Sequence, residues 1–160
     1  MLEVFVNAVI EDQQYNTFVV LLKEKYGDRT LPIWIGENEA MAIALSLEGI
    51  RPQRPLTHDL LKLVIDTFQA KVAKIGVEAL KNETYFAKIY IESDGKLFVI
   101  DARPSDSIAL ALRTKCTIVV SDELMNENGI VFQGDTSIEE LKRRLRNTKP
   151  EQFGDFSFNK

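Results

Sequence analysis

Acidic and basic side chains follow closely on one another in the segment IDARPSD. Asp101 ends a run of strand-forming residues, Arg103 comes two residues later, and Asp106 lies where a helix should begin. A helix N-terminus offers free backbone N–H groups to an anion, and carboxylates hold divalent cations, so this group can bind phosphate or metal. A second interpretation stays open, in which Asp106 only caps its helix and Arg103 pairs with Asp101 as a structural clamp.

The only histidine, His58, supplies the only imidazole for acid–base chemistry within one chain. It should lie at a helix start, where the helix dipole favours the neutral, base-competent ring, whereas the neighbouring Asp59 acts in the opposite direction. Arg51, Arg54 and Thr57 come just before it and can together receive a phosphate group. The alternative is an incidental surface histidine.

A metal site built from these residues would use oxygen ligands. Asp101, Asp106 and Glu39 are the candidates, and carboxylate oxygens suit Mg²⁺ or Mn²⁺. One histidine and one cysteine cannot fill the ligand set of zinc, so no zinc site is expected. The chain has no GxxxxGK[ST] phosphate loop, and no organic cofactor is evident.

Alternating and β-branched residues predict the strands that must position these groups. The Asp94-Gly95 pair is the strongest hairpin signal in the chain. The predicted strands cover residues 2–10, 17–22, 31–36, 71–80, 84–92, 97–101 and 117–120.

Three helices are predicted among these strands, at 37–48, at 57–69 and from Pro104 onward. Arg103 is the expected N-cap of the third, because proline favours the first helical position. Thr57 is the expected N-cap of the second. The buried stripe of that second helix is predicted to contain Leu60, Leu61, Val64, Ile65 and Phe68.

The two halves of the chain resemble each other. Residues 43–47 and 108–112 match at an offset of 65, and each helix follows three predicted strands. We therefore expect a single compact α+β domain over residues 1–135, made of two βββα halves with a mostly antiparallel or mixed sheet. A chance match of common helix formers is the competing explanation.

The C-terminal region carries its own pattern. A capping box and apolar spacing predict an amphipathic helix at 136–148, packed on or beside the domain, followed by a mobile tail at 149–160. The basic run 142–149 either follows a phosphate backbone or complements the end of that helix.

Composition limits the possible classes of protein. The chain has 160 residues, of which 45% are hydrophobic and 28% charged, as in one globular domain and unlike a disordered chain. Its net charge of −4 attracts no polyanion in general, so nucleic-acid binding requires a local patch.

Cysteine usage and hydropathy bear on the compartment. Cys116 is the only cysteine, the start lacks a signal-peptide pattern, and no apolar stretch approaches the roughly 20 residues that span a bilayer. A cytoplasmic protein without membrane association is therefore expected. Exposed strand edges lead us to expect a homodimer.

Three segments carry a resemblance to a known family. They are LPIWIGENEAMAIALSLEG at 31–49, RPLTHDLL at 54–61 and IDARPSDSIALALR at 100–113. Together they resemble the bifunctional nuclease domain family over roughly residues 1–121. The resemblance implies a nuclease that acts on RNA and DNA. The alternative is a non-catalytic regulatory or ligand-binding module, because the chain is acidic and has no paired histidines.

For a nuclease, the residues described above take separate expected roles. The candidate catalytic residues are His58, Asp59, Asp101 and Asp106. The candidate substrate-binding residues are Arg51, Arg54, Thr57 and Arg103.

Overall fold

The computed structural model describes residues 1–132, 140, 142 and 143. Eight strands in this part of the chain form one mixed sheet, in the order β6-β5-β4-β7-β1-β2-β3-β8. Four helices accompany the sheet within the described residues. The prediction of a single α+β domain is therefore confirmed.

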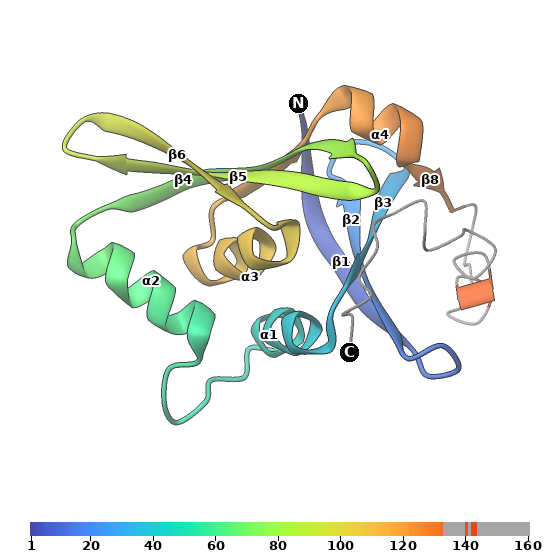
Figure 1. Ribbon diagram of the computed structural model, residues 1–160, viewed down its shortest axis with the longest axis horizontal. Coiled ribbons are helices and arrows are strands. Elements are labelled where there is room, and N and C mark those ends of the chain that lie inside the picture. Colours follow the sequence, from blue (N-terminus) through green and yellow to red (C-terminus); the bar gives the residue numbers. More distant parts are fainter. Residues whose placement is uncertain (133–139, 141, 144–160) are drawn as a thin grey trace.

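The first half of the domain is an antiparallel meander followed by a helix (Figure 1). Its strands are β1 (Leu2–Asp12), β2 (Thr17–Glu24) and β3 (Arg29–Ile35), and its helix is α1 (Glu37–Leu47). Trp34 in β3 is only 5% exposed, so it packs in the core.

The second half repeats this arrangement. Its strands are β4 (Lys71–Lys81), β5 (Thr84–Ser93) and β6 (Lys96–Ala102), and its helix is α3 (Pro104–Thr114). Asp94 and Gly95 have φ values of 50° and 71°, which is the left-handed geometry of a type I′ hairpin turn. The predicted hairpin is confirmed.

Strand β7 (Thr117–Val120) joins the two halves. It pairs in parallel with β4 and antiparallel with β1, so both meanders belong to one sheet. The short helix α4 (Asp122–Asn128) and strand β8 (Ile130–Val131) follow, and neither was predicted. Ser121 caps α4, because its Oγ accepts a hydrogen bond of 3.2 Å from Leu124 N.

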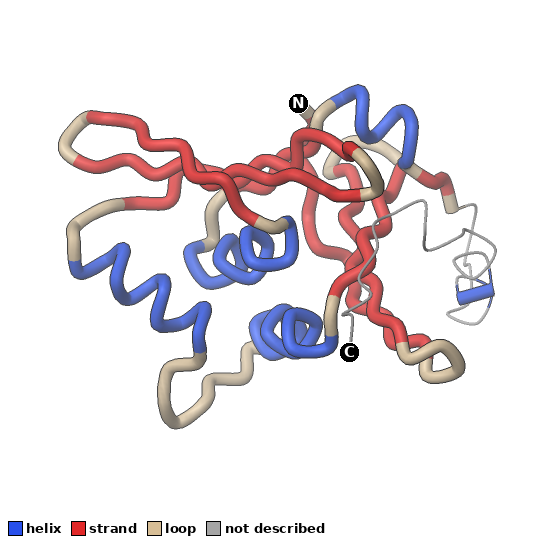
Figure 2. Tube along the Cα trace, in the orientation of Figure 1, coloured by secondary structure: helices blue, strands red, loops and turns tan. Residues whose placement is uncertain are grey.

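Helices α1 and α3 pack against each other beside the sheet (Figure 2). Ile43 of α1 and Ile108 and Leu110 of α3 are fully buried in the core. Burial of side chains this large stabilises the domain by roughly 1.5–3 kcal/mol each. Their packing fixes the starts of the two helices relative to each other.

Helix α2 (Thr57–Thr67) differs from its prediction in two ways. Its N-cap is Leu56 rather than Thr57, because the carboxylate of Asp59 turns back to accept a hydrogen bond from Leu56 N at 2.9 Å. Of its predicted buried stripe, only Ile65 is buried. Leu60, Leu61, Val64 and Phe68 are exposed, because the helix contacts the rest of the domain along a different side.

Some predictions fall on residues that the structure does not describe. Most of the expected helix at 136–148, most of the basic run at 142–149 and the whole tail at 149–160 lie outside the described residues. Within the described part of the chain, no helix has the length and apolar character needed to span a membrane.

Candidate active site

The start of α3 holds the centre of the site. Arg103 is the N-cap, with φ −70° and ψ 146°, and Pro104 is the first helical residue, as predicted. Asp106 follows in the first turn, close to the point where β6 ends at Ala102. The strand-to-helix junction in IDARPSD therefore places a carboxylate at a helix N-terminus.

Both carboxylate oxygens of Asp106 are occupied by cationic or ring nitrogens. His58 Nε2 lies 2.9 Å from Oδ1, and Arg103 donates from Nε to Oδ2 at 2.7 Å and from Nη2 to Oδ1 at 3.1 Å. The hydrogen bond with His58 contributes most to lowering the pKa of Asp106 from 3.8 to about 2, and Arg103 assists against partial burial.

The charge of Asp106 fixes the tautomer of His58. An ionised carboxylate can only accept hydrogen bonds, so Nε2 of the imidazole must carry the proton. Nδ1 is then the ring nitrogen that can accept a proton whenever the ring is neutral. This is the arrangement in which a carboxylate orients a histidine base.

Glu39 extends the cluster through Arg103. Its Oε1 lies 3.0 Å from Arg103 Nη2, which joins the start of α1 to the start of α3. Gly36 precedes α1, and a Cβ at that position would clash with Glu39 Oε2. A glycine there lets the carboxylate fold back over the helix start.

The cluster combines a shielded base with an accessible cation. The His58 side chain is 12% exposed, whereas that of Arg103 is 60% exposed. A substrate can therefore reach the guanidinium from solvent, while the imidazole is held in a fixed orientation between α2 and α3.

The low pKa of Asp106 predicts an acid-dependent loss of stability. Its folded-state pKa of about 2 lies below the ordinary 3.8, so its stabilising effect is present above pH 3.8 and is lost as the pH falls through 2. We expect wild type to exceed Asp106→Asn in unfolding free energy by about 1–2 kcal/mol at pH 6. Urea denaturation at several pH values should show this difference shrinking toward pH 2. A difference that does not depend on pH would contradict the assignment.

Asp59, predicted as catalytic, has a different set of contacts. Its Oδ1 lies 2.6 Å from Arg113 Nε, and its Oδ2 accepts from Leu56 N. Burial favours its neutral form, but these hydrogen bonds together hold the pKa below its usual range. Arg113 is buried and also donates to the carbonyls of Ala42 and Ala109. These contacts make Asp59 a clamp between α2 and α3.

The structure does not bring Asp101 to the cluster. Asp101 is opposite the exposed Lys88, whereas the next residue, Ala102, is opposite the buried Ala87. Successive side chains of a strand point to opposite faces, so Asp101 lies on the outer face of the sheet. The predicted clamp between Arg103 and Asp101 is replaced by the contacts of Arg103 with Asp106 and Glu39.

The expected metal ligands are therefore not gathered into one site. Asp106 and Glu39 are joined through Arg103, and Asp101 lies on the other face. Residues 1–132, 140, 142 and 143 contain no group of three or more His, Cys, Asp or Glu side chains placed to hold a metal ion. Three carboxylates arranged in this way do not fit a shared Mg²⁺ or Mn²⁺ site.

The remaining substrate-binding candidates lie near the start of α2. Arg51 and Arg54 are exposed in the connection between α1 and α2, and Thr57 is the exposed first residue of α2. Arg51 lines a cavity, together with Lys62 and Lys115, which sequence reasoning did not select. Neither lysine belongs to a recognisable motif, so only the fold reveals that they are neighbours.

Comparison of the amino-acid sequence with known proteins identifies a family and several relatives. The bifunctional nuclease domain model matches residues 20–133. An uncharacterized protein of Mycobacterium tuberculosis strain H37Rv is 38% identical over 154 residues, which cover 96% of this chain and 92% of that protein.

Plant relatives match more distantly. Bifunctional nuclease 1 of Oryza sativa subsp. japonica is 25% identical over 124 residues, or 76% of this chain and 38% of the rice protein. Bifunctional nuclease 2 of Arabidopsis thaliana is 28% identical over 115 residues, or 70% of this chain and 35% of that protein. The chain thus corresponds to just over a third of each plant protein.

Proposed function

We infer that this chain, which belongs to the bifunctional nuclease domain family, hydrolyses phosphodiester bonds of RNA, DNA or both. The observation that carries this proposal is the 2.9 Å contact between His58 Nε2 and Asp106 Oδ1. It supports a histidine base at a helix N-terminus beside an exposed arginine. The plant relatives are named bifunctional nucleases, and this supplies the reaction class.

His58 is the proposed general base. Nδ1 takes a proton from the attacking water as its oxygen bonds to phosphorus, and the resulting imidazolium then protonates the departing oxygen of the strand. Asp106 holds Nε2–H and stabilises the transient positive charge on the ring. Such base catalysis commonly contributes a factor of about 10² to 10⁴ in rate.

Arg103 is the proposed contact for the phosphoryl oxygens. Its Nε and Nη2 groups bind Asp106 and Glu39, but the side chain stays largely exposed, and Nη1 makes no hydrogen bond within the described residues. A guanidinium held in this way is preorganised to offset the negative charge that develops on the phosphate.

The proposed function is tested with a homogeneous preparation and labelled single-stranded RNA and DNA. Parallel reactions with Mg²⁺, Mn²⁺ or EDTA test the predicted metal dependence, which the arrangement of Asp101, Asp106 and Glu39 does not support. Cleavage that co-elutes with the protein supports the proposal. Strand binding without cleavage in any of these reactions would instead favour the non-catalytic ligand-binding alternative.

A second copy of the chain is the proposed protein partner. Strand β6 is an edge of the sheet, and both of its faces are apolar between Lys96 and Asp101. Helix α2 adds exposed apolar side chains at the same end of the molecule (Figure 1). Exposed fractions range from 45% for Val64 to 75% for Phe68 in the set Leu60, Val64, Phe68, Leu97, Phe98, Val99 and Ile100.

The apolar side chains of β6 flank its edge on both faces of the sheet. Leu97 and Val99 share the outer face with Asp101, whereas Phe98 and Ile100 lie on the face that carries the helices. A second copy that pairs along this edge covers apolar side chains on both faces. An antiparallel edge strand can pair with a copy of itself about a two-fold axis, since each copy offers the unpaired backbone groups that the other needs.

Light scattering should therefore give the mass of a dimer for wild type and of a monomer for Val99→Lys, which places a charge in the middle of β6. Tyr26→Lys, on an exposed turn far from β6 in the sheet order, is the matched control and should stay dimeric. A monomeric wild type at high concentration would contradict the proposal.

The location of the protein in the cell is a further proposal. We keep the cytoplasm as the expected location, because Cys116 is the only cysteine and burial raises the pKa of its thiol.

A further inference from the structure

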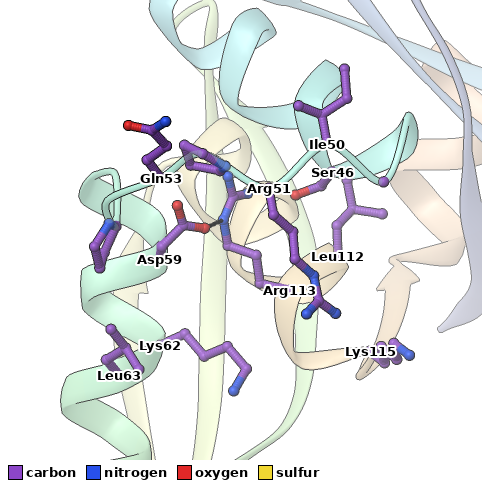
Figure 3. A pocket seen from close by; sticks show the side chains of 13 residues that line it. Ser46, Ile50, Arg51, Gln53, Asp59, Lys62, Leu63, Leu112, Arg113 and Lys115 are labelled. Carbon is purple, nitrogen blue, oxygen red and sulfur yellow. Dashed lines mark hydrogen bonds and ion pairs between the residues drawn. The ribbon is translucent and has the colours of Figure 1, made fainter.

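A cavity of about 680 Å³ opens beside the first turns of α2. Its walls come from the connection between α1 and α2, from α2 itself and from the C-terminal end of α3 (Figure 3). Ligand sites in proteins commonly have volumes of about 300–1,000 Å³, so the cavity can accept a nucleotide-sized group.

The lining of this cavity is strongly basic in an acidic protein. Four basic side chains and one carboxylate line it, although the whole chain has a net charge of −4. The carboxylate, Asp59, is bound to Arg113. Arg51, Lys62 and Lys115 remain, and Figure 3 shows Arg51 and Lys62 reaching into the space below the connecting loop.

These three cations are not used by the helix ends nearby. The fourth cation, Arg113, is already occupied, because it donates to Ala42 O and Ala109 O and pairs with Asp59. Lys62 has one surface ion pair, with Asp66 one turn along α2. Arg51 and Lys115 have no ion pair within the described part of the chain, so both can bind an incoming anion.

The cavity also has apolar walls. Ile50, Leu63 and Leu112 line it beside the cations. Cations that bind a phosphate next to aliphatic surface that covers a sugar or base suit a nucleotide better than a bare inorganic anion.

The cavity and the His58–Asp106 pair lie on two sides of the same helical turn. His58 contacts Asp106, whereas its neighbour Asp59 contacts Arg113 and lines the cavity. We propose that the cavity holds a nucleotide unit of single-stranded nucleic acid next to the unit that is cleaved. This inference rests on the proposed nuclease function, because it assigns the substrate class of the same site.

Binding without cleavage tests the inference separately from the activity. Fluorescence anisotropy of a labelled 12-nucleotide single strand, measured in EDTA with His58→Ala as the background, reports affinity alone. The triple change Arg51→Gln, Lys62→Gln and Lys115→Gln should weaken binding on the order of tenfold or more and reduce its salt dependence. The single change Arg51→Gln, at an exposed loop residue, should weaken it several-fold and serves if the triple variant fails to fold.

The matched control removes three positive charges elsewhere. Lys71→Gln, Lys81→Gln and Lys96→Gln alter exposed residues at the ends of β4 and β6, and this variant should bind within about threefold of the background protein. Equal losses in both triple variants, or unchanged binding in Arg51→Gln and the cavity triple, would overturn the inference. Binding of free AMP without binding of the strand would overturn the strand assignment.

The two proposals fail in different ways. If wild type cleaves nothing but the cavity variants lose strand binding, the nuclease function is wrong, and only the binding of a single strand by the cavity is supported. If wild type cleaves and the cavity variants bind like the background protein, the cavity assignment is wrong.

Discussion

His58→Ala should lower the rate of single-strand cleavage by about a hundredfold or more, because it removes the only imidazole of the chain. The carboxylates of Asp106 and Glu39 both bind Arg103, so neither is free to replace Nδ1 as the base. The rate should be measured under single-turnover conditions, with the protein at a saturating concentration and in excess over the labelled strand, so that product release does not limit it.

The control for this variant lies on the same helix. Thr67→Ala changes an exposed hydroxyl at the far end of α2, which donates to Leu63 O at 2.7 Å, and it should keep the wild-type rate. Melting curves of both variants must show folded protein, since a loss of activity that follows unfolding says nothing about catalysis. Full activity in a well-folded His58→Ala would remove His58 from the mechanism.

Asp106→Asn should also lower the cleavage rate by about a hundredfold or more. Asparagine keeps the shape of the side chain but loses the negative charge that holds Nε2–H and stabilises the imidazolium. The ion pair with Arg103 is lost as well, so the guanidinium is held less firmly. The expected loss of stability, about 1–2 kcal/mol, leaves the domain folded at room temperature.

Asp101→Asn is the matched control, because it makes the same chemical change two residues before Arg103. Asp101 lies on the outer face of the sheet, opposite Lys88, so this variant should keep the wild-type rate. A large loss of activity in both Asp101→Asn and Asp106→Asn would support the metal site predicted from sequence, and a loss in Asp101→Asn alone would contradict the roles given to both carboxylates.

Local signals predicted much of the fold. The Asp94-Gly95 turn and the Arg103-Pro104 helix start act through backbone preferences that neighbouring residues alone determine. The two βββα halves were also predicted, because each repeats the same alternation before a helix.

Other features depend on tertiary structure, which no local pattern contains. A shift of one residue along β6 decides whether Asp101 or Ala102 faces the core, and the sequence around Asp101 does not specify that register. The apolar stripe of α2 was predicted as buried because its period is helical, but most of it is exposed. Periodicity does not tell whether such a stripe packs against the same chain or against a second copy.

The candidate site was predicted only in part, because some of its residues are brought together by tertiary structure alone. His58, Arg103, Asp106 and Glu39 were selected by residue type and by position at helix starts, and the packing of α1, α2 and α3 brings them together. Arg113 and Lys115 lie at the C-terminal end of α3, and Lys62 lies in the middle of α2. No local pattern marks these three residues as a group, so only the assembled fold brings them to one cavity.

Cleavage across the elution profiles of two proteins tests the central claim most directly. Wild type and the double variant His58→Ala with Asp106→Asn are prepared identically, and each fraction is assayed on labelled single-stranded RNA and DNA. We predict that activity follows the wild-type peak, and that the double variant loses about as much as His58→Ala alone, because the two residues act as one unit. Equal activity in the two peaks, or no cleavage by any wild-type fraction, would contradict the account.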